Sequence, residues 1–248
     1  VPGLHTMACR PLFEFAPGYL GYYLNSPAYH SQLLPLMQGI KVEGLVEVGQ
    51  GLAVVPFKGK AQGMGKDPYY LMDKQAERIP IGCDRLLYLP YLMGERTPHL
   101  DPDCRGAFFG LSAMHTRQHM LRAVMEGVVY SQRDSVEVLR GMGVKINDML
   151  ACGGGGTSPL WRQMLADVYA CPVKTVASKE GPALGAAILA GVAAGIYASV
   201  PEACCSIIKT NPAQNPVAEN SAEYEKFYSV YKGLYPALKE NFAKLSSL

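Results

Sequence analysis

Four consecutive glycines, Gly153 to Gly156, are the feature of the sequence whose type and spacing point most directly to chemistry. They follow the apolar segment NDMLAC and precede Ser158-Pro159, which predicts a helix with a serine N-cap and a proline in its first turn. A strand, a glycine-rich turn and a helix start in this order can bind an anion, because backbone N–H groups and the helix dipole face the ligand.

The glycine run fits neither common phosphate-binding pattern. No lysine follows it, as the pattern G-x-x-x-x-G-K-[ST] requires. Ser158 stands where the dinucleotide pattern G-x-G-x-x-G has its last glycine. Taken alone, the run is therefore either a ligand-binding turn or simply a tight turn.

Two further groups of polar residues could contribute to a site. His115 and His119 have a spacing that can hold a metal ion, but no third ligand is near in sequence, which favours a solvated first helical turn and no metal site. The loop GERTPHLDPDCRG carries Glu95, Arg96 and Asp101 beside two prolines, and it either lines a binding cleft or pairs its charges at the surface. No catalytic triad or Cys-His pair is recognisable from residue order.

Composition excludes several classes of protein. The chain has 248 residues, 49% of them hydrophobic, which is typical of one large or two small globular domains. Its net charge of +2, without a dense basic run, argues against nucleic acid or anionic membranes as partners. Seven cysteines without C-x-x-C spacing fit a reducing, cytoplasmic location.

An uncharged stretch at 181–201 is long enough to span a bilayer. It consists mostly of alanine and glycine, so its insertion free energy is weak, and a buried helix packed closely against a sheet is the preferred interpretation. A membrane-spanning segment is the alternative.

Apolar periodicity predicts alternating strands and helices, and therefore an α/β layer architecture. Strands are expected at 86–89, in NDMLAC and in VKTVA, and helices at 159–169 and from Pro182. A helix capped by Thr116 should end at Gly141 and Gly143, and Ser221 should cap the last helix. The first of these has the apolar face Met120, Val124, Val128 and Leu139, and the second has the aromatic stripe Tyr224, Phe227, Tyr228 and Tyr231, which predicts a packing face.

Residues 1–66 lack this alternation, apart from a possible hairpin at 41–57. We therefore divide the chain into a divergent or incomplete N-terminal part, residues 1–66, and an organised domain, residues 67–248.

Three segments in order resemble the C-terminal domain of the FGGY carbohydrate kinases, most of all that of the xylulose kinases. They are LLYLPYLMGERTPHLDPDCRGAFFGL, then GAFFGLSAMHTRQHMLRAVMEG, then GGGGTSPLWRQMLADVYACPV with EGPALGAAILAG. The middle segment contains the family signature, with Gly110, His119 and Glu126 among its members. The resemblance covers residues 67–248 and a short LHTMAC near the start.

The resemblance implies a ribonuclease-H-like, actin-like ATPase fold, with a mixed sheet flanked by helices, and an ATP- and Mg²⁺-dependent sugar kinase with its active site between two domains. It places Gly153, Gly154, Gly155, Gly156 and Ser158 against the nucleotide, with the alanine- and glycine-rich helix packed under the pocket. Glu95, Arg96 and Asp101 are the expected cleft-lining residues.

Other parts of the family pattern are missing. The Gly-Gly-Asp segment with the catalytic aspartate, the Gly-Thr-Ser phosphate loop and the sugar-binding N-terminal domain are absent, and residues 11–66 are divergent, rearranged or frame-shifted. We therefore expect the ATP-binding half of a kinase for a ketopentose such as D-xylulose, inactive without its N-terminal domain; a homodimer is possible. The alternatives are a non-catalytic nucleotide-binding module and a family member acting on another sugar or polyol.

Overall fold

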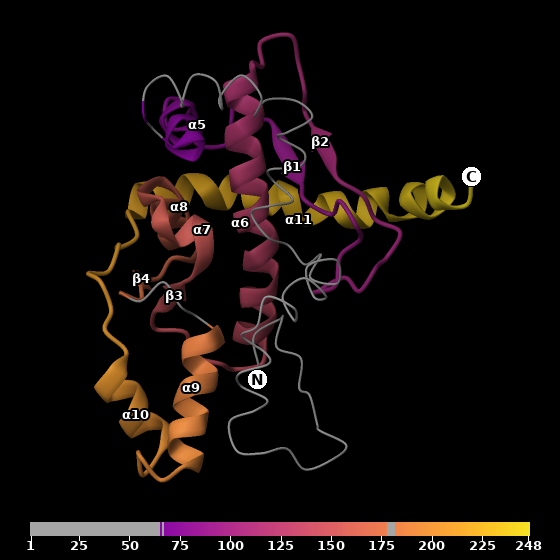
Figure 1. Ribbon diagram of the computed structural model, residues 1–248. Coiled ribbons are helices and arrows are strands. Elements are labelled where there is room, and N and C mark those ends of the chain that lie inside the picture. The colour runs from indigo at the N-terminus through magenta and orange to yellow at the C-terminus, as the bar shows by residue number, and fades with distance from the viewer. Residues whose placement is uncertain (1–64, 66, 178–181) are drawn as a thin grey trace. The chain divides into compact units, whose positions relative to one another are not determined.

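A computed structural model describes residues 65, 67–177 and 182–248 (Figure 1). Of these, 65, 67–175 and 212–248 belong to one compact unit, and 176, 177 and 182–211 belong to a second. The hairpin expected at 41–57 lies outside the described residues.

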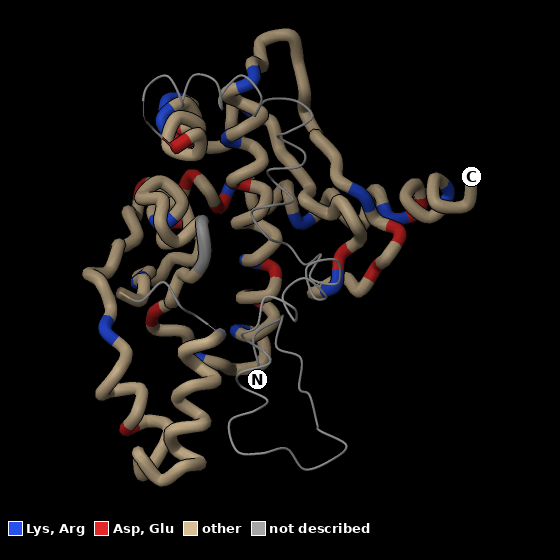
Figure 2. Tube along the Cα trace, viewed as in Figure 1, with Lys and Arg blue, Asp and Glu red and all other residues tan. Residues whose placement is uncertain are grey.

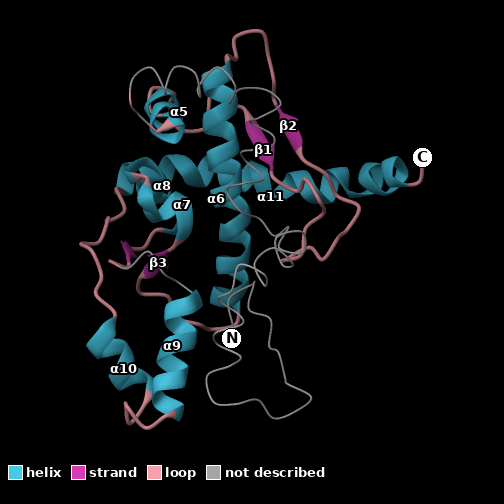
Figure 3. Cartoon of the chain, viewed as in Figure 1, coloured by secondary structure: helices cyan, strands magenta, loops and turns pink. Residues whose placement is uncertain are grey.

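The larger unit contains both helices and strands, with helices predominating (Figure 3). The strands form two pairs, an antiparallel pair β1–β2 and a parallel pair β3–β4; β2 was not predicted from the sequence. The strands are β1 Leu87–Leu89, β2 Ala107–Phe109, β3 Met149–Ala151 and β4 Val173–Thr175. The helices are α5 Pro68–Ala76, α6 Arg117–Gly141, α7 Gly153–Thr157, α8 Pro159–Tyr169 and α11 Ala218–Ser246.

Helix α6 is the central element, and it contacts β1, α5, α8 and α11. It begins after Thr116, as predicted, where Nδ1 of His119 accepts a hydrogen bond from the Thr116 N–H at 3.1 Å. Its buried residues run from Arg122 to Val136. Leu139 was expected on the same apolar face, and this prediction is wrong. The residue is 44% exposed, because the last turns of α6 extend beyond the buried part of the helix.

The contact between α6 and β1 depends on Gly127. A Cβ atom at this position would lie only 2.1 Å from the carbonyl oxygen of Tyr88, so any side chain would collide with the strand backbone. The helix can lie directly against the strand only because residue 127 has no side chain.

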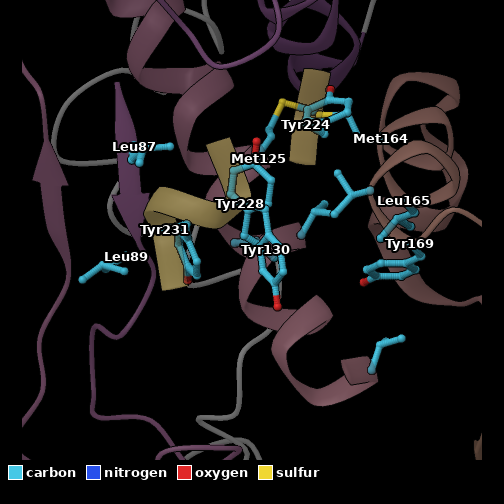
Figure 4. Close-up of a cluster of buried hydrophobic side chains, with 14 of the residues drawn as sticks. Leu87, Leu89, Met125, Tyr130, Met164, Leu165, Tyr169, Tyr224, Tyr228 and Tyr231 are labelled. Atoms are coloured by element: carbon cyan, nitrogen blue, oxygen red, sulfur yellow. The ribbon is translucent and has the colours of Figure 1, made fainter. Parts of the chain in front are cut away.

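The core that α6 shares with α11 is aromatic. Tyr130 lies beside Tyr228 and Tyr231 of α11 (Figure 4), with ring centroids 5.9 Å and 5.3 Å from its own. Tyr224 is also buried, and Phe227 packs against the cluster while partly exposed. The stripe predicted from the sequence is therefore confirmed as a packing face.

Helix α11 begins earlier than the sequence predicts. Its N-cap is Val217, and Ser221 lies within the first turns with its hydroxyl buried and without a hydrogen-bond partner. The capping acceptor comes from another helix: Asp167 of α8 accepts from the Val217 N–H at 2.8 Å and from Asn220 at 2.9 Å. A tertiary contact has replaced the local serine cap.

A buried ion pair joins α6 to two other segments. Arg122 donates from Nε to Glu126 at 2.7 Å and from Nη2 to the hydroxyl of Tyr224 at 2.6 Å. Glu126 also accepts a hydrogen bond from the N–H of Gly82 at 3.0 Å. The pair thus connects the turn before β1, helix α6 and helix α11.

The smaller unit contains α9 Pro182–Ala193 and α10 Val200–Ile207, which pack against each other. Figure 2 shows that α9 carries no charged residue. Of residues 183–193, however, only Ile188 and Gly191 are buried, so the expectation of a buried helix against a sheet is not confirmed. No helix in the described ranges is long and apolar enough to cross a membrane.

Two glycines of α6 offer a matched test of the helix–strand contact. Gly127→Ala should lower the free energy of unfolding by about 3 kcal/mol or more, because its methyl group would collide with the Tyr88 backbone. Gly141→Ala, which would meet no atom within 4 Å, should change it by less than about 1 kcal/mol. Urea denaturation measures both, and equal effects would contradict the contact.

The buried pair is tested by a double-mutant cycle. Arg122→Met should cost about 3–5 kcal/mol, because it leaves the Glu126 carboxylate buried without a counter-ion, whereas Arg122→Met with Glu126→Leu should cost less than the single change. Lys226→Met, which breaks an exposed pair with Glu223, is the control and should cost less than about 1 kcal/mol. If the costs of Arg122→Met and Glu126→Leu simply add up to the cost of the double variant, the two side chains are not coupled.

Candidate functional site

The candidate site lies at the carboxyl end of β3. Strands β3 and β4 are parallel, with Met149 paired to Val173 and Ala151 to Thr175. Their carboxyl ends therefore lie at the same edge, which is where ligands bind in open α/β sheets. The glycine run follows β3 at this edge after a single residue, Cys152.

The glycines form a short helix, α7, rather than an open loop. Cys152 precedes the helix in an extended conformation and caps it with no side-chain hydrogen bond. At Gly156, a Cβ atom would lie 3.0 Å from the carbonyl oxygen of Ala151, which is closer than ordinary contacts. The turn therefore presents main chain without side chains, and it packs tightly on the end of β3.

Ser158 is the predicted N-cap of α8 and performs this role. Its Oγ accepts from the N–H of Trp161 at 3.2 Å, and the residue is buried. Its hydroxyl also hydrogen-bonds the carboxylate of Asp73 in α5. Burial raises the pKa of Asp73, and this hydrogen bond opposes the rise. Sequence reasoning missed Asp73, because nothing local shows that α5 packs beside the start of α8.

Arg162, in the first turn of α8, joins the same group. Its Nη1 donates to the carbonyl oxygens of Gly156 at 2.8 Å and Thr157 at 3.1 Å. Arg162 was not among the candidate residues either, although an arginine one turn after a glycine-rich helix is a signal that could have found it.

The charged loop between β1 and β2 is held by its own backbone and by α11. Glu95 and Asp101 exchange two backbone hydrogen bonds of 2.8 Å, and Oδ2 of Asp101 accepts from the hydroxyl of Tyr235 at 2.8 Å. Glu95 is buried, which raises its pKa, whereas Arg96 is exposed. In Figure 1, α6 stands between this strand pair and α7, so the loop and the glycine helix are separate parts of the unit.

The two histidines face an aspartate rather than solvent. His119 lies 3.0 Å from Oδ2 of Asp84, and Nε2 of His115 lies 3.2 Å from the Asp84 carbonyl oxygen. The solvated first turn expected from the sequence is therefore wrong for His119, whose side chain is 12% exposed. Across the residues that the structure describes, no group of three or more His, Cys, Asp or Glu side chains could hold a metal ion.

The signature residues converge on one turn. Residues 82–85 all have positive φ, an unfavourable conformation for the three that are not glycine. Glu126 accepts from the first N–H of this turn, His119 faces Asp84, and a Cβ at Gly110 would lie 2.2 Å from the Arg85 carbonyl oxygen. The signature thus holds a strained turn in place.

A sequence profile described as the FGGY family of carbohydrate kinases, C-terminal domain, matches residues 45–194. The chain belongs to this family. The sequence resemblance is confirmed, and so is the fold, since the structural relatives are FGGY sugar kinases with the actin-like ATPase fold. Of the mixed sheet expected, the described residues contain one antiparallel and one parallel pair.

Relatives identified by sequence include two sugar-kinase types. The chain is 39% identical over 171 residues to the xylulose kinase of Bacillus subtilis (strain 168), a match covering 69% of this chain and 34% of that protein. It is 36% identical over 188 residues to the gluconokinase of Bacillus licheniformis, covering 75% of this chain and 36% of the relative. The chain therefore spans about a third of the length of the curated relatives it matches.

Solved structures from this family also superpose on the chain. The xylulose kinase from Rhodospirillum rubrum superposes with a TM-score of 0.70 at 29% identity, covering 83% of this chain and 39% of that one. A ligand-bound xylulose kinase from Lactobacillus acidophilus superposes with a TM-score of 0.67 at 29% identity, covering 77% and 39%. In both comparisons the chain matches the C-terminal part of a longer kinase.

The raised pKa of Asp73 predicts how the free energy of unfolding depends on pH. In the range just above the ordinary aspartate pKa of about 4, the folded chain keeps a proton that the unfolded chain has released, so the free energy of unfolding falls as pH rises through this range. Asp73→Asn should remove the contribution of Asp73 to this decline, and so make it shallower, while keeping an acceptor for Ser158. Urea denaturation at a series of pH values from about 4 to about 7 measures this change in the free energy of unfolding.

Ser158→Ala provides the internal check. It removes the hydrogen bond that opposes the rise in the Asp73 pKa, so the decline should extend to higher pH, and loss of the N-cap should cost about 1 kcal/mol at every pH. Identical profiles for the wild-type and Asp73→Asn chains would contradict the assigned role of this carboxylate.

Proposed function

We propose that the chain is the nucleotide-binding half of an ATP-dependent sugar kinase. The observation that carries this proposal is the glycine helix, whose bare main chain follows a parallel strand at its carboxyl end. The proposed nucleotide-contacting residues are Gly153, Gly154, Gly155, Gly156 and Ser158. The proposed domain extends over residues 67–248.

The residues at this edge suit a nucleotide. Four positions without side chains let a flat base, a ribose or an inner phosphate lie against main chain. At Gly156 a Cβ would point at Ala151, so this glycine also lets α7 pack closely on the end of β3. Bound ATP would supply the transferred phosphoryl group. The described residues contain no group of three or more His, Cys, Asp or Glu side chains that could hold a metal, and we name no Mg²⁺ ligand among them. Mg²⁺ in kinases is held largely by the phosphates of the nucleotide and one or two carboxylates.

The other expected cleft residues take different roles in this proposal. Glu95 and Asp101 hold the loop through their mutual backbone bonds and the contact to Tyr235. Arg96 is the one of the three that is exposed, and it is the one we propose to face the cleft of the complete kinase.

The proposed sugar is a ketopentose such as D-xylulose, because several relatives at 34–40% identity are named xylulose kinases. Another sugar or polyol is the alternative substrate, and the gluconokinases among the relatives favour a sugar acid such as gluconate as the second candidate. Phosphoryl transfer also needs a base for the sugar hydroxyl, which we propose is supplied by the N-terminal part of a complete kinase. The chain alone should therefore bind ATP without turning it over.

Isothermal titration with Mg²⁺–ATP tests the binding, and coupled detection of ADP with D-xylulose or gluconate tests turnover. We expect a dissociation constant in the range of about 1 μM to 1 mM, no turnover by the chain alone, and turnover after addition of the N-terminal half of the Bacillus subtilis xylulose kinase. Gly156→Ala should weaken binding about tenfold, whereas Gly233→Ala, in an open position of α11, should not.

The outcomes separate the candidate functions. Binding with turnover only in the presence of the N-terminal half supports a kinase half, and the preferred sugar decides between the two substrates. Binding that never leads to turnover favours a non-catalytic nucleotide-binding module. A failure of ATP to bind the wild-type chain would overturn the proposal.

A further inference from the structure

The short glycine helix cannot hold its own shape. Glycine loses more backbone freedom on folding than any other residue, and the last carbonyl groups of any helix lack partners within it. Helix α7 has only five residues, four of them glycine, so it lacks the side chains through which other helices are packed into place.

Arg162 supplies hydrogen-bond donors at the end of this helix. Its Nη1 donates to the carbonyl oxygens of Gly156 and Thr157, at 2.8 Å and 3.1 Å, which are the last two residues of α7. Hydrogen bonds from a guanidinium are charge-assisted and about twice as strong as neutral ones. Their direction also matches a cation at a helix C-terminus.

The guanidinium is itself held in place from the sheet. Its Nε donates to Oε1 of Gln214 at 3.4 Å, and Nε2 of Gln214 donates to Gln163 at 2.9 Å. The backbone of Gln214 exchanges hydrogen bonds of 2.8 Å and 2.9 Å with Val173 of β4. A continuous chain of contacts therefore runs from the edge of β4 through Arg162 to the glycine helix.

We propose that Arg162 is a positioning residue of the nucleotide site. It acts through the carbonyl groups of α7, so that the glycine main chain is already in its binding conformation before the nucleotide arrives. This inference rests on the proposed function, because holding the main chain in its binding conformation raises the affinity only if a nucleotide binds there.

Arg140 provides a matched control within the same unit. It donates from Nη2 to the carbonyl oxygen of Tyr169, at the end of α8, and from Nη1 to Glu137 at 2.8 Å. Helix α8 has a row of buried side chains that fixes it independently of this arginine. Removing Arg140 should therefore affect stability without affecting nucleotide binding.

The experiment compares Arg162→Ala, Arg162→Lys and Arg140→Ala in the 248-residue chain. Isothermal titration gives the dissociation constant for Mg²⁺–ATP, and hydrogen–deuterium exchange without nucleotide reports on the amides of residues 151–160. Arg162→Ala should raise the dissociation constant about tenfold or more and speed exchange in this segment by a similar factor. Arg162→Lys should recover part of both, and Arg140→Ala should keep the dissociation constant within about twofold of wild type.

Two results would overturn the inference while leaving the proposed function intact. One is a wild-type chain that binds ATP and an Arg162→Ala chain that binds it within about twofold as tightly. The other is an equal loss of affinity in Arg162→Ala and Arg140→Ala, which would indicate general destabilisation. A wild-type chain that binds no ATP would overturn the proposed function and, with it, the nucleotide role of Arg162, whatever the exchange rates.

Discussion

The larger unit depends on one close approach, the main chain of α6 against the main chain of β1 at Gly127. Because no side chain separates them, the residues on either side of Gly127 meet fixed neighbours. Glu126 reaches the turn that precedes β1, and Arg122, one helical turn earlier, reaches Tyr224 of α11. A buried pair of this kind stabilises only while both partners are present, so its main consequence is a single arrangement of turn, helix and C-terminal helix.

The candidate site receives its position from the same helix through α8. Helix α6 packs on α8, whose first turn carries both Ser158 and Arg162 toward the glycine helix. A binding surface made of main chain without side chains needs this support, because glycine residues do not fix their own conformation. The chemistry at the edge of β3 is therefore sparse: a bare backbone, a buried hydroxyl with its carboxylate partner, and an arginine that holds the backbone from behind. This arrangement fits the proposed nucleotide-binding surface better than it would fit a centre for acid–base catalysis.

Charged residues in this domain serve mainly to fasten segments together. Glu95 and Asp101 close their loop onto α11, Asp167 caps α11 from α8, and His119 with Glu126 restrains the strained turn at 82–85. Each of these contacts joins segments far apart in the sequence. The family signature is explained in part by this turn, since three of its residues, including Gly110, contact it.

Local patterns in the sequence were sufficient for several of the elements, but not for β2, α5 or α10. The β1, β3 and β4 strands, the Thr116 start of α6, the Ser158-Pro159 start of α8 and the aromatic face of α11 all follow from apolar spacing and capping chemistry, and three ordered motifs identified the family. Tertiary structure alone decided the partners: Asp73 for Ser158, Asp167 in place of Ser221 as the cap of α11, and Arg162 for the carbonyl groups of the glycine helix. It also decided that the end of α6 at Leu139 is exposed. The reason is physical. Periodicity and caps are properties of neighbouring residues, whereas a hydrogen bond between two helices depends on how their packed faces meet, and no short segment contains that information.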